Sequence, residues 1–181
     1  MSNPVNDSEF LEKFAPVVYN VALRLVGNPS DAEDLAQDAL LRALKGLQAF
    51  RGDSQMSTWV YRVTVNTWKN RVRSEKRRGF WKTVTLNLFT GDEEDGTEPA
   101  FAGDDPPLDA GLETEERGLV VEKALLELDE ESRAVVVLRE LEGQSYQDIA
   151  QALEIPEGTV KSRLSRARSA LKDRLKKYAG P

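Results

Sequence analysis

The chain has 181 residues, of which 40% are hydrophobic and 31% are charged, and it contains neither cysteine nor histidine. These absences exclude disulfides and thiolate metal sites, and they remove the commonest general base and transition-metal ligand. Because no nucleophile with its base, phosphate-binding glycine loop or carboxylate cage is recognisable either, we expect no catalysis, no cofactor and no metal.

The formal net charge of −6 argues against a nucleic-acid partner until its distribution along the chain is considered. Residues 62–82 hold eight lysines and arginines against the single acid Glu75, whereas residues 91–116 hold eleven acids and no lysine or arginine. The sign of the local charge therefore says more about possible partners than the net charge of the whole chain does. Without a signal-peptide pattern or a membrane-spanning apolar run, we expect a soluble cytoplasmic protein.

Two helices are expected in the first forty-seven residues, because strong helix formers dominate and apolar residues recur at helical spacing. The first begins near Glu9 and ends at residues 27–29, and Ser30 with Glu33 forms a capping box for the second. The second helix directs Leu35, Ala39, Leu40, Leu44 and Leu47 inward, and Asp31, Asp34, Gln37 and Asp38 outward. An acidic first turn is also what a helix dipole favours, so these carboxylates need no function.

A third helix is expected over residues 57–78, after a turn-rich loop at residues 50–54. Two of its stripes lie at helical spacing: an apolar one of Tyr61, Val65, Trp68 and Val72, and a polar one of Arg62, Asn66, Lys69, Arg73 and Arg77. This combination suits single-stranded DNA: the cations can contact its phosphate backbone, the rings can stack on its bases, and the asparagine amide can hydrogen-bond to a base edge. The alternative, that the rings are simply core, stays open for each ring alone.

Residues 83–113 break every periodic pattern and are rich in glycine, proline and acids. We expect an acidic flexible linker there, which divides an all-α chain into two small helical domains, residues 1–82 and 114–181. Each domain is expected to have a core of its own. The second domain is expected to hold two helices and then a helix-turn-helix.

The helix-turn-helix is predicted over residues 143–177. Ser145 can cap its first helix, and Pro156 marks the start of a longer basic helix whose apolar stripe comprises Val160, Leu164, Ala167, Leu171 and Leu175. Such a second helix can lie in the DNA major groove. A solvated amphipathic hairpin is the alternative, but the small residues near the helix start and the charge density favour DNA.

With these residues in view, nearly the whole chain resembles the group IV, or extracytoplasmic-function, sigma factors of bacterial RNA polymerase, of the sigma-E type. The resemblance rests on DAEDLAQDALLRAL at 31–44, FRGDS at 50–54, the helix at 57–78 and the stretch 126–172, in this order. It implies an alternative sigma factor for stress responses that binds core polymerase, directs it to promoters and helps to melt the DNA. It implies no enzymatic activity.

The resemblance also implies site residues and partners. The partners are promoter DNA, core RNA polymerase (clamp helices of the largest subunit and flap of the second largest) and an anti-sigma factor, without membrane insertion. The implied core-binding residues are Asp31, Asp34, Leu35, Gln37 and Asp38. The implied minus-ten residues are Phe50, Arg51, Asp53, Ser54, Trp59, Tyr61, Arg62, Asn66, Lys69 and Arg73. The implied minus-thirty-five residues are Thr159, Lys161, Ser162, Arg163, Ser165, Arg166 and Arg168.

Two rival functions are compatible with parts of this pattern. A stand-alone transcriptional regulator would share the helix-turn-helix, but it needs a receiver or ligand-binding domain that the helical first half does not provide. An enzyme acting on nucleic acid is disfavoured by the missing histidine, cysteine and metal-ligand clusters.

The linker carries no readable motif, so its match to the family rests on position and charge. The promoter sequence, the regulon and the inducing signal are not encoded in any recognisable pattern.

Overall fold

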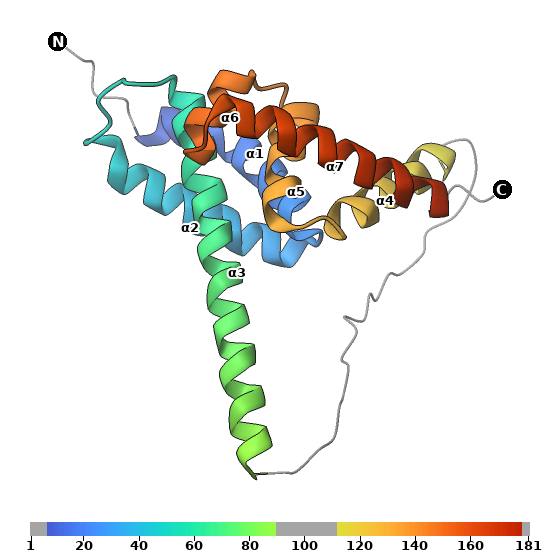
Figure 1. Cartoon of the computed structure of the whole chain (residues 1–181). Coiled ribbons are helices and arrows are strands. Elements are labelled where there is room, and N and C mark those ends of the chain that lie inside the picture. Colours follow the sequence, from blue (N-terminus) through green and yellow to red (C-terminus); the bar gives the residue numbers. More distant parts are fainter. Residues whose placement is uncertain (1–6, 90–111, 179–181) are drawn as a thin grey trace.

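The computed structural model of the chain describes residues 7–89 and 112–178, with side chains described for 7–79 and 118–177. Every regular element in these ranges is helical (Figure 1), as the all-α prediction requires. The elements are α1 (Asp7–Val26), α2 (Pro29–Leu47), α3 (Met56–Phe89), α4 (Leu112–Leu126), α5 (Glu130–Val136), the π-helical η1 (Val137–Leu141), α6 (Tyr146–Leu153) and α7 (Glu157–Tyr178).

The turn between α1 and α2 differs from the expected capping box. Gly27 ends α1 with a left-handed φ of 82°, a conformation that glycine adopts without steric cost. The α2 cap is Asn28, whose side-chain oxygen accepts a 2.9 Å hydrogen bond from the N–H of Asp31. Pro29 follows in the first turn, where its missing N–H is not needed. Ser30 and Glu33 therefore do not cap the helix, and that prediction was wrong.

Helix α3 is longer than the sequence pattern indicated. It was expected to end at residue 78 but continues to Phe89, so its last seven residues fall in the range expected to be linker. The remainder of that range up to residue 111 lies outside the described residues. Figure 1 shows the C-terminal part of α3 standing away from the other helices, which leaves the cationic residues Arg73, Arg77 and Arg78 exposed.

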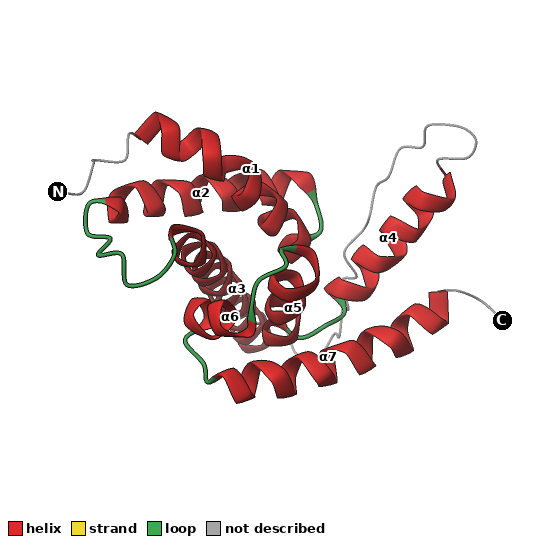
Figure 2. Cartoon of the chain, turned by 90° about the horizontal axis from the view of Figure 1, so that it is seen from above, coloured by secondary structure: helices red, strands yellow, loops and turns green. Residues whose placement is uncertain are grey.

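Side-chain caps define the helices of the second half. Asp129 accepts a hydrogen bond from the N–H of Ser132 at the start of α5. Ser145 accepts one from the N–H of Asp148 at the start of α6, as predicted. Glu154 then takes a left-handed φ of 56°, and Pro156 stands directly before α7 with its carbonyl accepting the first helical hydrogen bonds. Helices α4 and α7 meet at one end and spread apart at the other (Figure 2).

The two halves share one hydrophobic core, although we expected one core per domain. A single cluster of buried residues contains Phe10, Leu25 and Trp68 from the first half together with Leu125 and Ile149 from the second. The helices in contact across the two halves are α3 with α6, α1 with α4 and α1 with η1. The position of the second half against α3 therefore bears directly on the residues assigned to DNA.

Candidate nucleic-acid interface

The loop between α2 and α3 forms an open pocket of about 380 Å³. The Phe50 and Trp59 rings pack together at a tilt of 47° with centroids 5.3 Å apart. Trp59 also lies against Gly46, where a Cβ atom would come within 3.0 Å of the ring. Gly52 turns the loop with a φ of 77°. Six residues assigned to the minus-ten site line the pocket: Phe50, Arg51, Asp53, Ser54, Trp59 and Arg62. An aromatic pair beside two arginines can hold an unstacked base and its phosphate.

The polar stripe of α3 continues from this pocket along the helix. Asn66 and Arg73 are exposed and Lys69 is half-buried, so all three can reach a ligand that lies along this face. Arg71 lies off the stripe and is held by ion pairs to Asp31 at 2.7 Å and to Glu75 at 3.2 Å. The stripe predicted from helical spacing is therefore accessible at Asn66 and Arg73 and partly accessible at Lys69.

Tyr61 does not belong to that exposed surface. Its side chain is only 6% exposed, and its hydroxyl donates a 3.0 Å hydrogen bond to Glu142 from the second half. Burial raises the pKa of Tyr61, and the charge and hydrogen bond of Glu142 raise it further. Tyr61 is therefore a core residue in this arrangement, and so is Trp68, as the alternative interpretation of the rings predicted.

The acidic face of α2 divides into two groups. Asp34, Gln37 and Asp38 are exposed on one side of the helix, and Leu41 continues that side with 56% of its surface exposed. We call these four residues the α2 face. Leu41 follows Gln37 by four residues, so helical spacing places it on the same side of α2 and adds one apolar side chain to the polar ones.

Two further residues assigned to core binding have structural positions instead. Leu35 is fully buried in the core. Asp31 pairs with Arg71 and accepts a 2.8 Å hydrogen bond from the side-chain amide of Asn28. These two residues hold α2 against its neighbours, and the assignment of Leu35 to an accessible surface does not agree with its burial.

The second helix of the helix-turn-helix presents a polar face near its N-terminal end. Lys161, Ser162, Ser165, Arg166 and Arg168 are exposed, whereas Thr159 is half-buried. The apolar stripe predicted for this helix is confirmed at Val160, Leu164 and Ala167, which are buried. The helix therefore offers two small hydroxyl residues flanked by long cations, which is a combination that can approach base edges and phosphates.

The cations of this face differ in how firmly they are held. Lys161 pairs with Glu157 at 2.8 Å, and Arg168 pairs with Glu140 at 2.6 Å. Hydrogen bonds to these carboxylates raise the pKa of both cations. Arg166 has no ion pair among the residues that the structure describes and donates only a 3.4 Å hydrogen bond to the Ser162 carbonyl.

Arg163 has a different role from its neighbours on α7. It is half-buried and forms an ion pair with Glu131 at the start of α5, so it joins α5 to α7. Its assignment to the DNA-reading face does not match this position. The periodicity of the basic helix could not reveal the difference, because Arg163 and Arg166 look alike in sequence and differ only in what packs against them.

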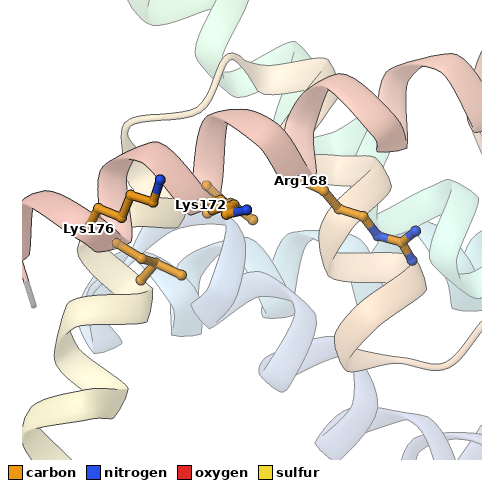
Figure 3. A pocket seen from close by; sticks show the side chains of 5 residues that line it. Arg168, Lys172 and Lys176 are labelled. Atoms are coloured by element: carbon orange, nitrogen blue, oxygen red, sulfur yellow. The ribbon is translucent and has the colours of Figure 1, made fainter.

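A second hollow of about 450 Å³ lies along the C-terminal part of α7 (Figure 3). Leu171 and Leu175 provide its apolar lining, and Arg168, Lys172 and Lys176 stand at successive turns beside them. Its lining is apolar and cationic, so the hollow offers a surface for contact. Its cations extend the basic surface of α7 beyond the predicted reading residues.

The sites found are therefore surfaces suited to binding. Within residues 7–89 and 112–178, no group of three acidic side chains is placed to hold a metal ion. No helix in the same ranges is long and apolar enough to cross a membrane.

Comparison with known proteins identifies the family. The model of sigma-70 region 2 matches residues 10–78, and the model of sigma-70 region 4 matches residues 119–171. The RNA polymerase sigma-H factor of Pseudomonas aeruginosa is 36% identical over 162 residues, covering 88% of this chain and 80% of that protein. The ECF RNA polymerase sigma-E factor of Escherichia coli K12 is 36% identical over 145 residues, covering 80% of this chain and 74% of that protein.

A solved structure supports the same conclusion. The sigma factor RpoE of Bartonella quintana, in complex with the anti-sigma factor NepR, is similar to this chain with a TM-score of 0.67 and 28% identity, covering 93% of this chain and 95% of the other. Both halves and their order thus agree with one family. The chain belongs to the extracytoplasmic-function sigma factors of RNA polymerase, which are transcription initiation factors and not enzymes.

Proposed function

We propose that this sigma factor docks on core polymerase through the α2 face, reads and melts the minus-ten element with the α2–α3 pocket and α3, and reads the minus-thirty-five element with α7. Family membership gives the general role. The pocket is the observation that carries the finer assignment, because it brings six residues scattered over residues 50–62 into one hollow large enough for a base.

Core docking follows from the α2 face. Asp34, Gln37 and Asp38 can form charged and polar contacts while Leu41 contributes an apolar one, a combination common at protein interfaces. The proposed partner is the pair of clamp helices in the largest subunit, and the second half would contact the flap of the second largest. The buried Leu35 would support this surface from below.

Melting follows from the pocket and the polar stripe. A base of the non-template strand would leave the duplex and enter the hollow between Phe50 and Arg51, with Trp59 beneath it. Extruding a base costs a few kcal/mol, which stacking and hydrogen bonds inside the pocket must offset. Asn66 would read a neighbouring base, and Lys69 with Arg73 would follow the backbone.

Recognition of the upstream element follows from α7. The exposed hydroxyls of Ser162 and Ser165 allow the helix to approach base edges, and Arg166 is placed to contact a guanine or a phosphate. Lys161 and Arg168 would exchange their carboxylate partners for phosphates. A recognition helix in the major groove places its N-terminal residues nearest the bases, which is where these side chains lie.

The remaining parts of the proposal concern organisation and partners. The two halves would act as two promoter-reading domains, and the acidic stretch between α3 and α4 as a tether through the polymerase cleft; residues 83–89 of the predicted linker belong to α3 and residues 112 and 113 to α4. An anti-sigma factor would cover the same faces when the factor is silent. The site of action would be the cytoplasm, where the polymerase and the promoter are found.

A selection experiment tests this proposal. Holoenzyme assembled from core polymerase and this chain is mixed with fragmented DNA of the source bacterium, and the 5′ ends of the transcripts are sequenced. We expect start sites that share two sequence elements at a fixed spacing. Transcripts no different from those of core polymerase alone would contradict the proposal.

A further inference from the structure

The last turn of α2 holds both aromatic rings of the minus-ten pocket. The Gly46 carbonyl accepts a 3.0 Å hydrogen bond from the N–H of Ala49. The Leu47 carbonyl accepts one of 3.2 Å from the N–H of Phe50, so the chain turns tightly as it leaves the helix. The Trp59 ring, from the first turn of α3, lies against Gly46. The end of α2 therefore decides where the two rings meet.

The backbone conformation of Gly46 does not require glycine. The residue lies within α2, and its φ is not in the left-handed region, unlike that of Gly52 in the loop. A glycine inside a helix is less favourable than alanine because it loses more backbone freedom on folding. A Cβ atom at Gly46 would lie 3.0 Å from Cζ2 and 3.6 Å from Cη2 of Trp59, and outside its own helix backbone it would meet no other described atom within 4 Å. The close approach of the ring is therefore the feature that the missing side chain permits.

A methyl group at Gly46 would displace the Trp59 ring. Carbon atoms pack best at about 3.5–4.0 Å, so a contact of 3.0 Å requires a shift of a few tenths of an ångström. Trp59 lines the pocket and Gly46 does not, so a shift of the ring away from α2 changes the pocket. The ring would move into the hollow or against Phe50, whose ring centroid is 5.3 Å away. Either movement alters the space and the stacking surface available to a base.

The contact between Gly46 and Trp59 lies on a different side of α2 from the α2 face. The residues of the α2 face recur at a spacing of three and four, which keeps them on one side of the helix. Gly46 follows Leu41, the last of them, by five residues, which places it about a third of a turn away. A change at Gly46 can therefore affect the pocket without touching the surface assigned to core docking.

We propose that Gly46 is a positioning residue for promoter melting: its missing side chain lets Trp59 lie against the end of α2, and the ring so placed is the surface on which the extruded base stacks. The inference rests on the function proposed above, because it concerns the pocket assigned to that base. Gly46 acts through Trp59 and makes no contact with DNA of its own.

Two matched alanine substitutions test this role. G46A adds a methyl group against Trp59, and G118A adds one to α4, where a Cβ atom would meet nothing within 4 Å. Both replace a helical glycine, so both should leave the midpoint of thermal unfolding unchanged or raise it. We expect G46A to lower promoter opening about threefold or more with core binding unchanged, because the stacking surface is misplaced, and G118A to lower neither. Promoter opening by G46A equal to that of the native chain, or a lowered unfolding midpoint that accounts for its loss, overturns the inference.

A double variant shows whether the effect passes through the Trp59 ring. The atoms nearest the added methyl group, Cζ2 and Cη2, belong to the outer part of the indole, and the smaller ring of W59F does not extend that far. W59F alone should lower promoter opening, since it reduces the stacking surface. Adding G46A to W59F should then cost less opening than adding G46A to the native chain, because two residues in contact do not act independently. An effect of G46A that is the same in both backgrounds overturns the role through Trp59.

Abasic DNA separates the inference from the proposed function. Holoenzyme binding is measured on single-stranded non-template oligonucleotides of the minus-ten element, each with one base removed. We expect one position at which removal of the base weakens binding by the native chain, and at which G46A and the native chain then bind equally, because no base enters the pocket. If no position matters to the native chain, the proposed extrusion fails and the inference fails with it. If one position matters and the deficit of G46A persists there, the inference alone is overturned.

Discussion

Arg133 donates a 2.7 Å hydrogen bond from its Nη1 to the backbone carbonyl of Leu25, and this bond joins α5 in the second half to the end of α1 in the first. The same guanidinium donates to the carbonyls of Leu125, Leu126 and Leu128, and it lies 5.6 Å from the centroid of the Trp68 ring. One side chain thus caps the C-terminal ends of α1 and α4, where carbonyl groups lack helical partners. Burial lowers the pKa of Arg133, and the charges of Glu130 and Asp129 partly offset that effect.

Replacing Arg133 should therefore lower the free energy of unfolding. In R133M the apolar chain can be accommodated, but four carbonyls lose the guanidinium as donor, although that of Leu125 still accepts from the N–H of Leu128, and we expect a loss of about 2–3 kcal/mol in denaturant unfolding. R133K should lose somewhat less, because one ammonium reaches fewer carbonyls than the planar fork. The matched control is R174K, since Arg174 pairs with Glu127 within the second half and at the surface. An equal effect of R174K and R133M would contradict this account of the interface.

Asp129 provides a prediction with a defined pH dependence. Burial tends to raise the pKa of this carboxyl, but hydrogen bonds from the side chain and backbone N–H of Ser132 and from Glu131 outweigh it and leave the pKa below its ordinary value. A carboxylate with a lowered folded-state pKa stabilises the fold above its unfolded pKa, and that contribution is lost as pH falls through the folded pKa.

We expect D129A to lose about 1 kcal/mol of unfolding free energy at neutral pH, because the first turn of α5 loses its cap. D129N should lose much less, since asparagine caps a helix nearly as well. The difference between the native chain and D129A should narrow as the pH falls below the ordinary pKa of an aspartate and through the lowered folded-state pKa. Denaturant unfolding at several pH values measures this difference in unfolding free energy. A difference that does not depend on pH would show that the carboxylate is not the stabilising group.

Asn66 and Lys69 should act on promoter opening. Both lie on the accessible stripe of α3, away from the α2 face. We expect N66A/K69A to retain core binding while promoter opening falls about tenfold or more, because one base contact and one phosphate contact are lost. Permanganate reactivity of melted thymines measures opening, and polymerase co-purification measures binding. An equal loss of both activities would point to a folding defect instead.

Arg166 and Arg163 offer a matched pair on one helix. R166A should weaken use of a promoter by about 1–3 kcal/mol, and this penalty should vanish when the minus-thirty-five element is scrambled. R163A should instead reduce the stability of the chain, because Arg163 joins α7 to Glu131 at the start of α5. Transcription from the intact and the scrambled promoter measures the effect of R166A on promoter use. Thermal unfolding measures the effect of R163A on stability. A penalty from R166A that persists on the scrambled promoter would contradict the reading role.

The features that could be predicted from sequence are those that periodicity and local capping decide. The apolar stripe of α7 and the Ser145 cap are confirmed, because each depends on residues within a few positions of one another. The α1–α2 turn was mispredicted since Asn28 and Pro29 were interpreted as the end of one helix, although they also begin the next. Local chemistry allowed both interpretations.

The features that could not be predicted are contacts between the halves. Tyr61 and Asn66 lie on the same helix, and helical spacing places both near the surface used for DNA. The apolar stripe left open whether the Tyr61 ring was core or stacked on DNA, and its place in the shared core, with a hydrogen bond to Glu142 eighty-one residues later in the chain, shows that it is core. Tertiary packing, which a single sequence does not display, decides this case. Leu35 is different, because the apolar spacing of α2 already predicted it to point inward; its burial confirms that spacing and not the core-binding role that the family resemblance implied.

The central claim is that this chain directs core polymerase to a two-element promoter, and run-off transcription on one selected promoter tests it most directly. Four matched templates are compared: the intact promoter, one with the minus-ten element scrambled, one with the minus-thirty-five element scrambled, and one with both scrambled. The account predicts a transcript of defined length from the intact template only when this chain is added, with reduced yield from either single change. Equal yield from all four templates, or from core polymerase without the chain, would contradict it.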